Sequence, residues 1–195
     1  MKDNNKSTCW PFKLDEVAFY AWAENVFTKQ ECDLIIETCL KKGISKAGVS
    51  KQSIINEKIR DSDVVFMFPE ELTWVFPRLT DIITALNEKF FKFNLFGFQE
   101  GIQFTVYKKN QMYKRHVDRI YQAKIRKLSL SVQLSEPKTY KGGDLVLYEG
   151  ENETFAKKEV GSITLFPSFV EHEVRPVTKG TRYSLVAWIT GDSFK

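Results

Sequence analysis

The chain has 195 residues, of which 43% are apolar and 14% aromatic, so it can bury the core of one folded domain and is not an intrinsically disordered chain. The formal net charge is only +4, and the Lys and Arg residues are scattered in groups too short to form a nucleic-acid-binding stripe. No apolar run reaches the length of a membrane span, and the polar residues 1–6 lack the apolar core of a signal peptide. We therefore expect neither a nucleic-acid nor a membrane partner.

The three cysteines are odd in number and show no repeated spacing, which argues against a disulfide framework. Cys9 lies near the N-terminus, whereas Cys32 and Cys39 fall seven residues apart on one face of a predicted helix, where we expect small buried thiols. Unpaired thiols fit a reducing compartment, so the sequence predicts a cytoplasmic protein.

The first part of the chain predicts a peripheral arm at residues 1–12, followed by a helix. Thr28 and Glu31 match a capping box, in which each side chain binds the backbone N–H of the other residue at a helix start. Apolar residues then recur at helical spacing until Gly43, which predicts the end of the helix. Residues 44–61 are polar and are predicted to form a loop.

A second helix is predicted after a short apolar strand at residues 64–68. Pro69 is expected to open this helix in its first turn. Apolar residues then recur at helical spacing from Leu72 to Phe90, and we interpret the aromatics among them as core residues. Pro77 lies inside the pattern and predicts a kink or a break.

From about residue 100 the segments are shorter and β-rich, and turn signals such as Gly142-Gly143 separate them. Residues 127–134 alternate between apolar and polar side chains, which predicts a strand with one apolar face. Strands are predicted at 101–107, 112–118, 127–134, 144–148, 161–166, 172–177 and 182–189. The whole chain therefore predicts a single α+β domain over residues 1–195, with helical support at about 13–95 and a β-sandwich or barrel at about 96–191.

The chain contains only two histidines, and both lie in this β-rich part. His116 and Asp118 are two residues apart, so on a strand they point to the same face, and His172 follows later. Two imidazoles and one carboxylate can occupy one face of a non-haem Fe(II) ion and leave the other positions open for chemistry. A lone His-x-Asp pair is more often a surface coincidence and a lone His more often structural, so the metal interpretation depends on the combination.

Arg182 follows His172 by ten residues and strengthens that combination. The segment Leu185–Trp188 beside it reads as a buried strand, where an unpaired Arg would be costly. A carboxylate ligand would remove that cost, and the planar guanidinium suits a carboxylate better than Lys does. Ser184 shares the face of Arg182. The alternative is a surface arginine paired with a carboxylate of the protein.

Taken in order, these motifs resemble the Fe(II)/2-oxoglutarate-dependent dioxygenases, and most of all their prolyl 4-hydroxylase-like branch, over roughly residues 24–190. The resemblance lies in Val26–Cys32, Gln103–Tyr107, Tyr113–Asp118, Leu128–Leu134, Tyr140–Leu145, Gly161–Pro167, His172–Val174 and Arg182–Leu185. It implies a double-stranded β-helix, or jelly-roll, core supported by N-terminal helices.

The resemblance also implies roles for individual residues. The implied Fe(II) ligands and catalytic residues are His116, Asp118 and His172, and the implied salt-bridge partner of the 2-oxoglutarate C5 carboxylate is Arg182. Tyr107 matches a tyrosine that lines the active site in relatives. Gln133 stands where many prolyl hydroxylases have a tyrosine that binds the co-substrate, and its amide offers a hydrogen bond instead. Ser184 is a further candidate contact.

The reaction implied by the resemblance uses Fe(II), 2-oxoglutarate and O2, with ascorbate as a candidate additional cofactor. Oxidative decarboxylation of the oxo-acid to succinate and CO2 is coupled to hydroxylation of an unactivated C–H bond. Halogenating relatives replace the carboxylate at Asp118 with a small residue, so its presence favours hydroxylation. The implied substrate is a peptide or protein, with proline the leading target, and the basic residues Arg119, Lys124, Arg126 and Lys127 mildly favour an acidic or peptide substrate.

Three alternatives remain open at this point. The substrate can be a free amino acid or small metabolite. Relatives that demethylate nucleic acids carry a further Arg six residues after the first, but Trp188 stands there in this chain. A non-catalytic metal-binding jelly-roll module is the third alternative, and the presence of all three candidate ligands and Arg182 argues against it.

Overall fold

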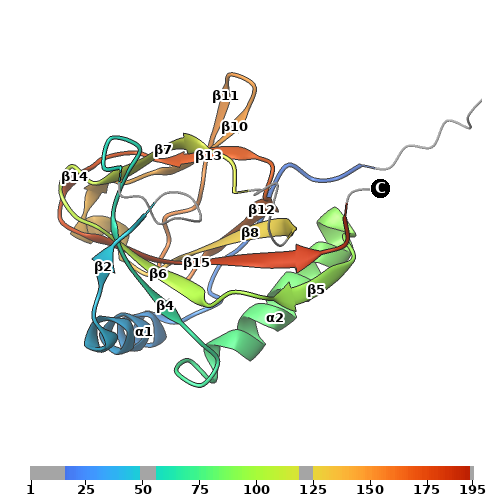
Figure 1. Cartoon of the computed structure of the whole chain (residues 1–195), viewed down its shortest axis with the longest axis horizontal. Helices are drawn as coiled ribbons and strands as arrows, with labels where there is room; N and C mark the ends of the chain where they lie inside the picture. The colour runs from blue at the N-terminus through green and yellow to red at the C-terminus, as the bar shows by residue number, and fades with distance from the viewer. Residues whose placement is uncertain (1–15, 49–55, 119–124, 194–195) are drawn as a thin grey trace, which may run out of the picture.

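The computed structural model of the chain describes residues 16–48, 56–118 and 125–193, and it forms two facing antiparallel sheets with two helices against one of them (Figure 1). The helices are α1 (Lys29–Lys42) and α2 (Val75–Leu86), and α2 continues into a π-helical turn, Asn87–Phe91. No helix of the described part is long and apolar enough to cross a membrane.

The major sheet has eight strands. Their spatial order is β1 (Ala21–Ala23), β12 (Ile163–Pro167), β8 (Arg126–Gln133), β15 (Arg182–Gly191), β6 (Ile102–Tyr107), β4 (Asp63–Met67) and β2 (Ser45–Lys46), with β5 (Leu95–Phe98) paired to the far end of β15. The minor sheet has five strands, in the order β11 (Asn152–Phe155), β10 (Leu145–Glu149), β13 (Glu171–Val174), β7 (Met112–His116) and β3 (Arg60–Asp61). A short ribbon joins β9 (Lys141–Gly142) to β14 (Val177–Lys179).

The chain order of these strands identifies the jelly roll. From β6 onward the chain passes to β7, β8, β10, β12, β13 and β15, and each step crosses from one sheet to the other. Two helical windings of antiparallel strands result, which confirms the predicted α+β class with a double-stranded β-helix. Four strands from the first part of the chain, β1 to β4, extend the edges of the two sheets.

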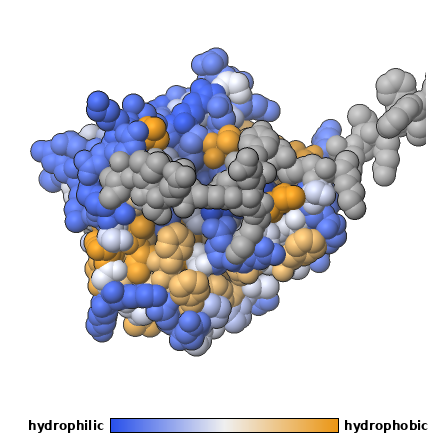
Figure 2. All heavy atoms as spheres, in the orientation of Figure 1, coloured by the Kyte–Doolittle hydropathy of each residue, from blue (hydrophilic) through white to orange (hydrophobic). Residues whose placement is uncertain are grey.

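Two apolar clusters hold these layers together. The larger joins both helices to the outer face of the major sheet and includes Ile35, Leu79, Phe104, Leu130 and Leu185. The smaller lies between the sheets and includes Tyr107, Leu145, Leu147, Phe166, Val170, Val174 and Val177. Figure 2 shows a largely hydrophilic surface over the minor sheet and a gathering of apolar side chains near β4.

Apolar and polar side chains alternate along β8, so they point into different environments. Its apolar residues, Leu128, Leu130 and Val132, pack in the larger cluster under the helices. Its polar residues, Ser129 and Gln133, point to the other face, which is buried between the two sheets and not in solvent. The polar face of this strand therefore lines the interior of the jelly roll, where a polar ligand can be held.

Helix α1 has the predicted bounds and caps. The Thr28 side chain accepts a hydrogen bond from the Glu31 backbone, and the Glu31 carboxylate accepts one from the Thr28 backbone N–H at 2.8 Å. Gly43 ends the helix at a φ of 90°, a conformation that favours glycine. Cys32 and Cys39 are fully buried and unpaired, as predicted.

Helix α2 begins later than predicted. Residues 69–74 form turns, so Pro69 does not open the helix, which starts at Val75. Pro77 is then the third helical residue and neither kinks nor breaks the helix. The reason is that the first four N–H groups of a helix have no partner within it, so a proline there removes no hydrogen bond.

The predicted loop at 44–61 instead contains two short strands, β2 and β3, and strands β1, β5, β9 and β11 were also missed. These segments are two to four residues long and pair at sheet edges, so they carry little periodicity. The predicted arm at 1–12, with Cys9, lies outside the described residues.

Candidate active site

The minor sheet brings the two histidines together. His116 ends β7 and lies opposite His172 of β13 in the antiparallel register, with ring centroids 4.2 Å apart. Asp118 follows β7 and reaches both rings: its carboxylate oxygens lie 3.7 Å from His116 Nε2 and 3.4 Å from His172 Nε2. One ligand atom from each residue lies within 4.8 Å of the others, and no second such group of His, Cys, Asp or Glu occurs among the described residues.

Backbone carbonyls set the tautomers of both rings. His116 Nδ1 lies 2.6 Å from the Lys114 carbonyl oxygen, and His172 Nδ1 lies 3.0 Å from that of Val170. In each ring Nδ1–H donates to the carbonyl, so the lone pair on Nε2 faces Asp118. Burial and the neighbouring His172 lower the pKa of His116 to about 4, which keeps this imidazole neutral at pH 7.

Asp118 is buried and hydrogen-bonded. Its Oδ2 accepts a 2.8 Å hydrogen bond from Ser129 Oγ on β8, and its backbone N–H donates to the Ser168 carbonyl at 3.1 Å. Burial alone would raise the pKa of this carboxyl, but the two imidazoles and the Ser129 hydroxyl outweigh it, and the net pKa is lowered. Two imidazoles and one carboxylate directed at one point are a donor set that fits Fe(II).

Aromatic side chains enclose the histidines. Tyr113 stacks on His116 with a centroid distance of 3.5 Å, and Phe166 packs edge-on against His172 at 4.8 Å. Arg60, on β3, lies over the Tyr113 ring at 4.7 Å. Arg60 was not predicted as a site residue, because β3 was not recognised as a strand.

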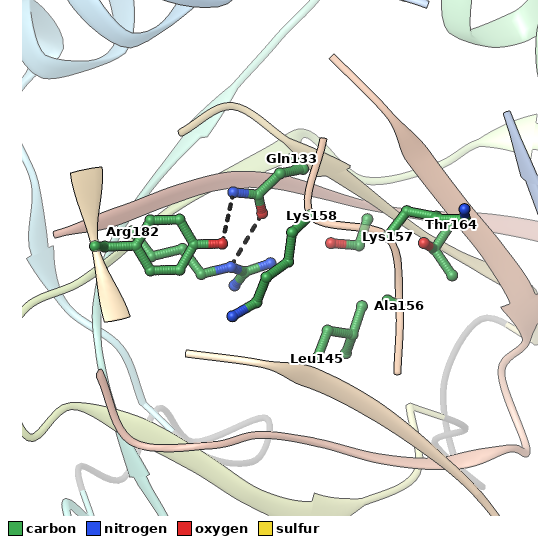
Figure 3. A pocket seen from close by; sticks show the side chains of 9 residues that line it. Gln133, Leu145, Ala156, Lys157, Lys158, Thr164 and Arg182 are labelled. Atoms are coloured by element: carbon green, nitrogen blue, oxygen red, sulfur yellow. Dashed lines mark hydrogen bonds between the residues drawn. The ribbon is translucent and has the colours of Figure 1, made fainter. Parts of the chain in front are cut away.

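The polar face of the major sheet forms a second part of the site. A cavity open to solvent lies beside this face, next to β10, β12 and the segments that precede them (Figure 3). It is lined by Ser131, Gln133, Tyr140, Leu145, Ala156, Lys157, Lys158, Thr164 and Arg182. The structure therefore brings Arg182 and Gln133 together in one cavity.

Arg182 is 3% exposed, and its Nε donates a 3.1 Å hydrogen bond to Gln133 Oε1, one of the dashed lines in Figure 3. Gln133 Nε2 in turn donates to the Ser135 carbonyl at 2.9 Å and to the Tyr140 hydroxyl at 3.0 Å. No carboxylate of the described residues lies within ion-pair distance of Arg182. A buried cation without an anionic partner is costly, and an anionic ligand would remove that cost.

Tyr107 and Ser184 lie beside this cavity but do not line it. Tyr107 is opposite Arg182 in the β6–β15 register, with the guanidinium carbon 5.8 Å from its ring centroid. Ser184 is opposite Gln133 on β8 and is buried. Burial raises the pKa of Tyr107, so its phenol stays neutral.

Strand β8 connects the two parts of the site. Ser129, which binds Asp118, and Gln133, which binds Arg182, share its inner face and are four residues apart. At about 3.3 Å per residue, the Cα atoms of Ser129 and Gln133 are about 13 Å apart, so one strand supports both parts of the site.

The predicted basic loop is only partly described, since Arg119 and Lys124 lie outside the described residues. Arg126 is paired with Glu100, at 2.7 Å, and stacks on Trp188 at 3.8 Å. Lys127 is buried. These two residues are committed to contacts within the protein, so they offer no free basic surface to a substrate.

Besides Arg60, the sequence analysis missed Ser129, Tyr140 and Lys158 as residues of this site. Ser129 was part of a recognised alternating strand, but its polar face was not assigned to the interior. Tyr140 precedes Gly142-Gly143, a pattern noted only as a turn. Lys158 belonged to a short Lys pair that was interpreted as solvated, and its Nζ pairs with Asp144 at 2.6 Å at the cavity wall.

Comparison with known proteins agrees with this geometry. Residues 102–190 match the family model described as the 2OG-Fe(II) oxygenase superfamily. A PKHD-type hydroxylase of Prochlorococcus marinus (strain MIT 9312) is 36% identical over 90 residues, which are 46% of this chain and 41% of the relative. The chain thus spans about two fifths of that relative's length.

Solved structures share the fold over nearly the whole chain. A Pseudomonas putida prolyl-4-hydroxylase has a TM-score of 0.71 at 20% sequence identity. The aligned region covers 90% of this chain and 94% of the hydroxylase chain. A prolyl hydroxylase from Trichoplax adhaerens, solved with a peptide of hypoxia inducible factor, has a TM-score of 0.76 at 17% identity and covers 89% and 84%. In its fold, its matched segment and its His-Asp-His cluster, the chain is thus similar to the 2OG-Fe(II) oxygenase superfamily over residues 102–190.

Proposed function

We propose that this chain is an Fe(II)- and 2-oxoglutarate-dependent dioxygenase that hydroxylates an unactivated C–H bond, and that residues 1–195 act as one such domain. One observation carries the proposal. A cluster of two imidazoles and a carboxylate, of which Asp118 and His172 are buried, faces the same jelly-roll interior as Arg182, a buried cation with no carboxylate partner among the described residues.

In this proposal His116, Asp118 and His172 hold Fe(II), and Arg182 binds the C5 carboxylate of 2-oxoglutarate. Gln133 fixes the guanidinium through its Nε. Tyr107 and Ser184 are proposed to shape the cation end, since each lies opposite Arg182 or Gln133 on a neighbouring strand.

Bound Fe(II), 2-oxoglutarate and O2 would supply an oxidative decarboxylation that yields succinate and CO2 and inserts one oxygen atom into a substrate C–H bond. The residues of the chain orient the participants. Arg182 fixes the far end of the oxo-acid, and Ser129 holds the Asp118 carboxylate toward the two imidazoles. Because Asp118 occupies the place a halide would need, hydroxylation is favoured over halogenation.

The metal assignment is tested by His116→Ala and His172→Ala. Each variant is expected to fold and to lose Fe(II)-dependent succinate formation, because the remaining two ligands and their hydrogen-bond partners cannot replace the third. The matched control is Lys114→Ala, an exposed residue on the same strand as His116, which should keep its activity. Full turnover in either histidine variant would contradict the assignment.

We propose that the substrate is a peptide-borne side chain, with proline the leading candidate. Two observations on relatives support it: the structural neighbours include prolyl hydroxylases, and one of them was solved with a bound peptide fragment. A free amino acid or small metabolite is the second candidate substrate. We propose neither a nucleic acid nor a membrane as a partner.

A proline-containing peptide library tests the substrate class. The protein is incubated with Fe(II), 2-oxoglutarate and ascorbate, and mass spectrometry maps any gain of one oxygen atom to a residue. Oxidation of a free metabolite with no peptide modified would reject the peptide substrate and keep the dioxygenase. Absence of succinate release with every substrate class would favour a non-catalytic metal-binding module.

The proposed compartment is the cytoplasm. The support is that Cys32 and Cys39 are both buried and unpaired, a state typical of a reducing environment.

A further inference from the structure

We infer that the Tyr140 hydroxyl is a further contact of the 2-oxoglutarate C5 carboxylate, where it donates a hydrogen bond beside Arg182. This inference rests on the proposed function, and it assigns to Tyr140 a role that Gln133 was expected to fill. It follows from counting the donors and acceptors at the cation end of the cavity.

The Gln133 amide has no donor left for a ligand. An amide side chain has two N–H donors and one carbonyl. The donors go to the Ser135 carbonyl at 2.9 Å and to the Tyr140 oxygen at 3.0 Å, and the carbonyl accepts from Arg182 Nε at 3.1 Å. Gln133 therefore holds Arg182 and Tyr140 side by side through a hydrogen bond to each.

The Tyr140 hydroxyl, by contrast, keeps its donor. Its oxygen accepts from Gln133, so its own hydrogen is directed elsewhere, and no acceptor for it is found among the described residues. Tyr140 is 4% exposed and lines the cavity with Arg182. A buried hydroxyl hydrogen without a partner is unfavourable, and a carboxylate oxygen in the cavity would accept it.

The charges of the cavity wall agree with one bound carboxylate. Lys158 Nζ lies 2.6 Å from Asp144 Oδ1 and 5.2 Å from the Tyr140 ring centroid, so Asp144 balances this cation. Lys157 lies 3.3 Å from Glu24. Arg182 has no such counter-ion among the described residues, which leaves one positive charge at the cavity wall for one carboxylate.

The turn after Tyr140 allows the close approach of the two side chains. Gly143 has a φ of +62°, and a Cβ there would lie 3.2 Å from Arg182 Cδ and 3.5 Å from Tyr140 Cε2. A side chain at position 143 would therefore push between Arg182 and Tyr140. The Gly142-Gly143 pattern is thus part of the cation end as well as a turn.

The test is Tyr140→Phe, which keeps the ring and removes only the hydroxyl. The 2-oxoglutarate dissociation constant is measured by anaerobic calorimetry on the full chain loaded with Fe(II), and it should rise roughly ten- to hundredfold, the usual loss for a hydrogen bond to a charged group. Fe(II) affinity should stay unchanged. Tyr148→Phe is the matched control, since its hydroxyl donates to Glu173 on the minor sheet at 2.6 Å and the residue does not line the cavity, and it should leave 2-oxoglutarate affinity within about twofold.

A second ligand tests whether a loss of 2-oxoglutarate affinity arises at the C5 carboxylate. The oxo-acid 2-oxopentanoate has the same chain length but no C5 carboxylate, so Tyr140→Phe should bind it as the unaltered protein does. An unchanged 2-oxoglutarate dissociation constant, or an equal loss for both oxo-acids, would overturn the inference. If Arg182→Ala also left 2-oxoglutarate affinity unchanged, the proposed co-substrate site itself would fail, so the two failures are distinguishable.

Discussion

The orientation of the side chains at the metal site is set by neighbours within hydrogen-bond distance. Carbonyl acceptors at Nδ1 orient His116 and His172 with Nε2 facing Asp118, and the Ser129 hydroxyl donates to the Asp118 carboxylate. The site is thus arranged for a divalent cation by residues that themselves make no contact with it.

Replacing Ser129 tests this arrangement. Ser129→Ala removes the 2.8 Å hydrogen bond to Asp118 Oδ2, so the carboxylate loses its orientation. We expect Fe(II) affinity to fall roughly tenfold or more, as for other hydrogen-bond partners of metal ligands. Titration with Fe(II) under anaerobic conditions measures the change. Ser131→Ala, two residues further on the same face, should leave Fe(II) affinity unaltered, and a similar loss in both variants would contradict the prediction.

Replacing Arg182 tests the cation end. Arg182→Ala removes the buried guanidinium that we assign to the C5 carboxylate, and a charge-assisted pair of this kind is worth on the order of a hundredfold in affinity. We expect calorimetry to show weaker 2-oxoglutarate binding by about that factor with little change for Fe(II). Arg175→Ala is the control, because Arg175 pairs with Glu153 and Glu173 on the minor sheet, away from the cavity. Equal 2-oxoglutarate affinity in Arg182→Ala would move the carboxylate site elsewhere.

At the scale of elements, α1 depends on its N-terminal cap as well as on its buried face. Glu31 accepts a hydrogen bond from the Thr28 backbone and pairs with Arg78 on α2 at 2.7 Å. One carboxylate therefore caps the first helix and ties it to the second.

The cap predicts a pH dependence. The Thr28 backbone hydrogen bond, together with Arg78, lowers the pKa of Glu31 below its ordinary value of 4.5. A lowered carboxyl pKa means that the stabilisation is fully present above about pH 4.5 and is lost as the pH falls through the folded-state value. Glu31→Gln should therefore reduce the free energy of unfolding by roughly 0.5–1 kcal/mol at pH 7 and by less near pH 3. Urea unfolding at both pH values measures this difference.

The control is Glu37→Gln on the same helix. Glu37 pairs only with the exposed Lys41 among the described residues, so its replacement should change stability less at pH 7. A pH-independent effect of Glu31→Gln, or an equal effect of both variants, would contradict the role of the cap.

At the scale of the whole molecule, the two helices cover the major sheet and bury the thiols of α1. Burial raises the pKa of Cys32 and of Cys39 to about 12, so neither forms a thiolate near neutral pH. In a Cys9→Ser background, we expect iodoacetamide at pH 8 to leave the native protein unmodified and to alkylate both residues after unfolding in urea. Mass spectrometry counts the adducts, and rapid alkylation of the native protein would show that α1 opens from the sheet.

The sequence alone determined the features that depend on neighbouring residues. The Thr28–Glu31 cap, the end of α1 at Gly43, the alternation of β8 and the shared face of His116 and Asp118 all follow from local backbone geometry, and the structure has each of them. The order of short strands after a helical part, with the resemblance of the motifs, also predicted the jelly roll. The predicted kink or break at Pro77 was wrong, because the effect of a proline depends on where the helix begins. The helix begins at Val75 and not at Pro69, so Pro77 lies in its first turn.

Only the tertiary structure decided which distant residues meet. His172 reaches His116 because β13 pairs with β7 in one register, and a shift of one residue would turn it to the other face. The polar side of β8 lies inside because the helices cover its apolar side, and Tyr140 reaches Gln133 and Arg182 because the glycine turn leaves space. Pairing register and the choice of buried face arise from packing between segments far apart in the chain, which local periodicity does not encode.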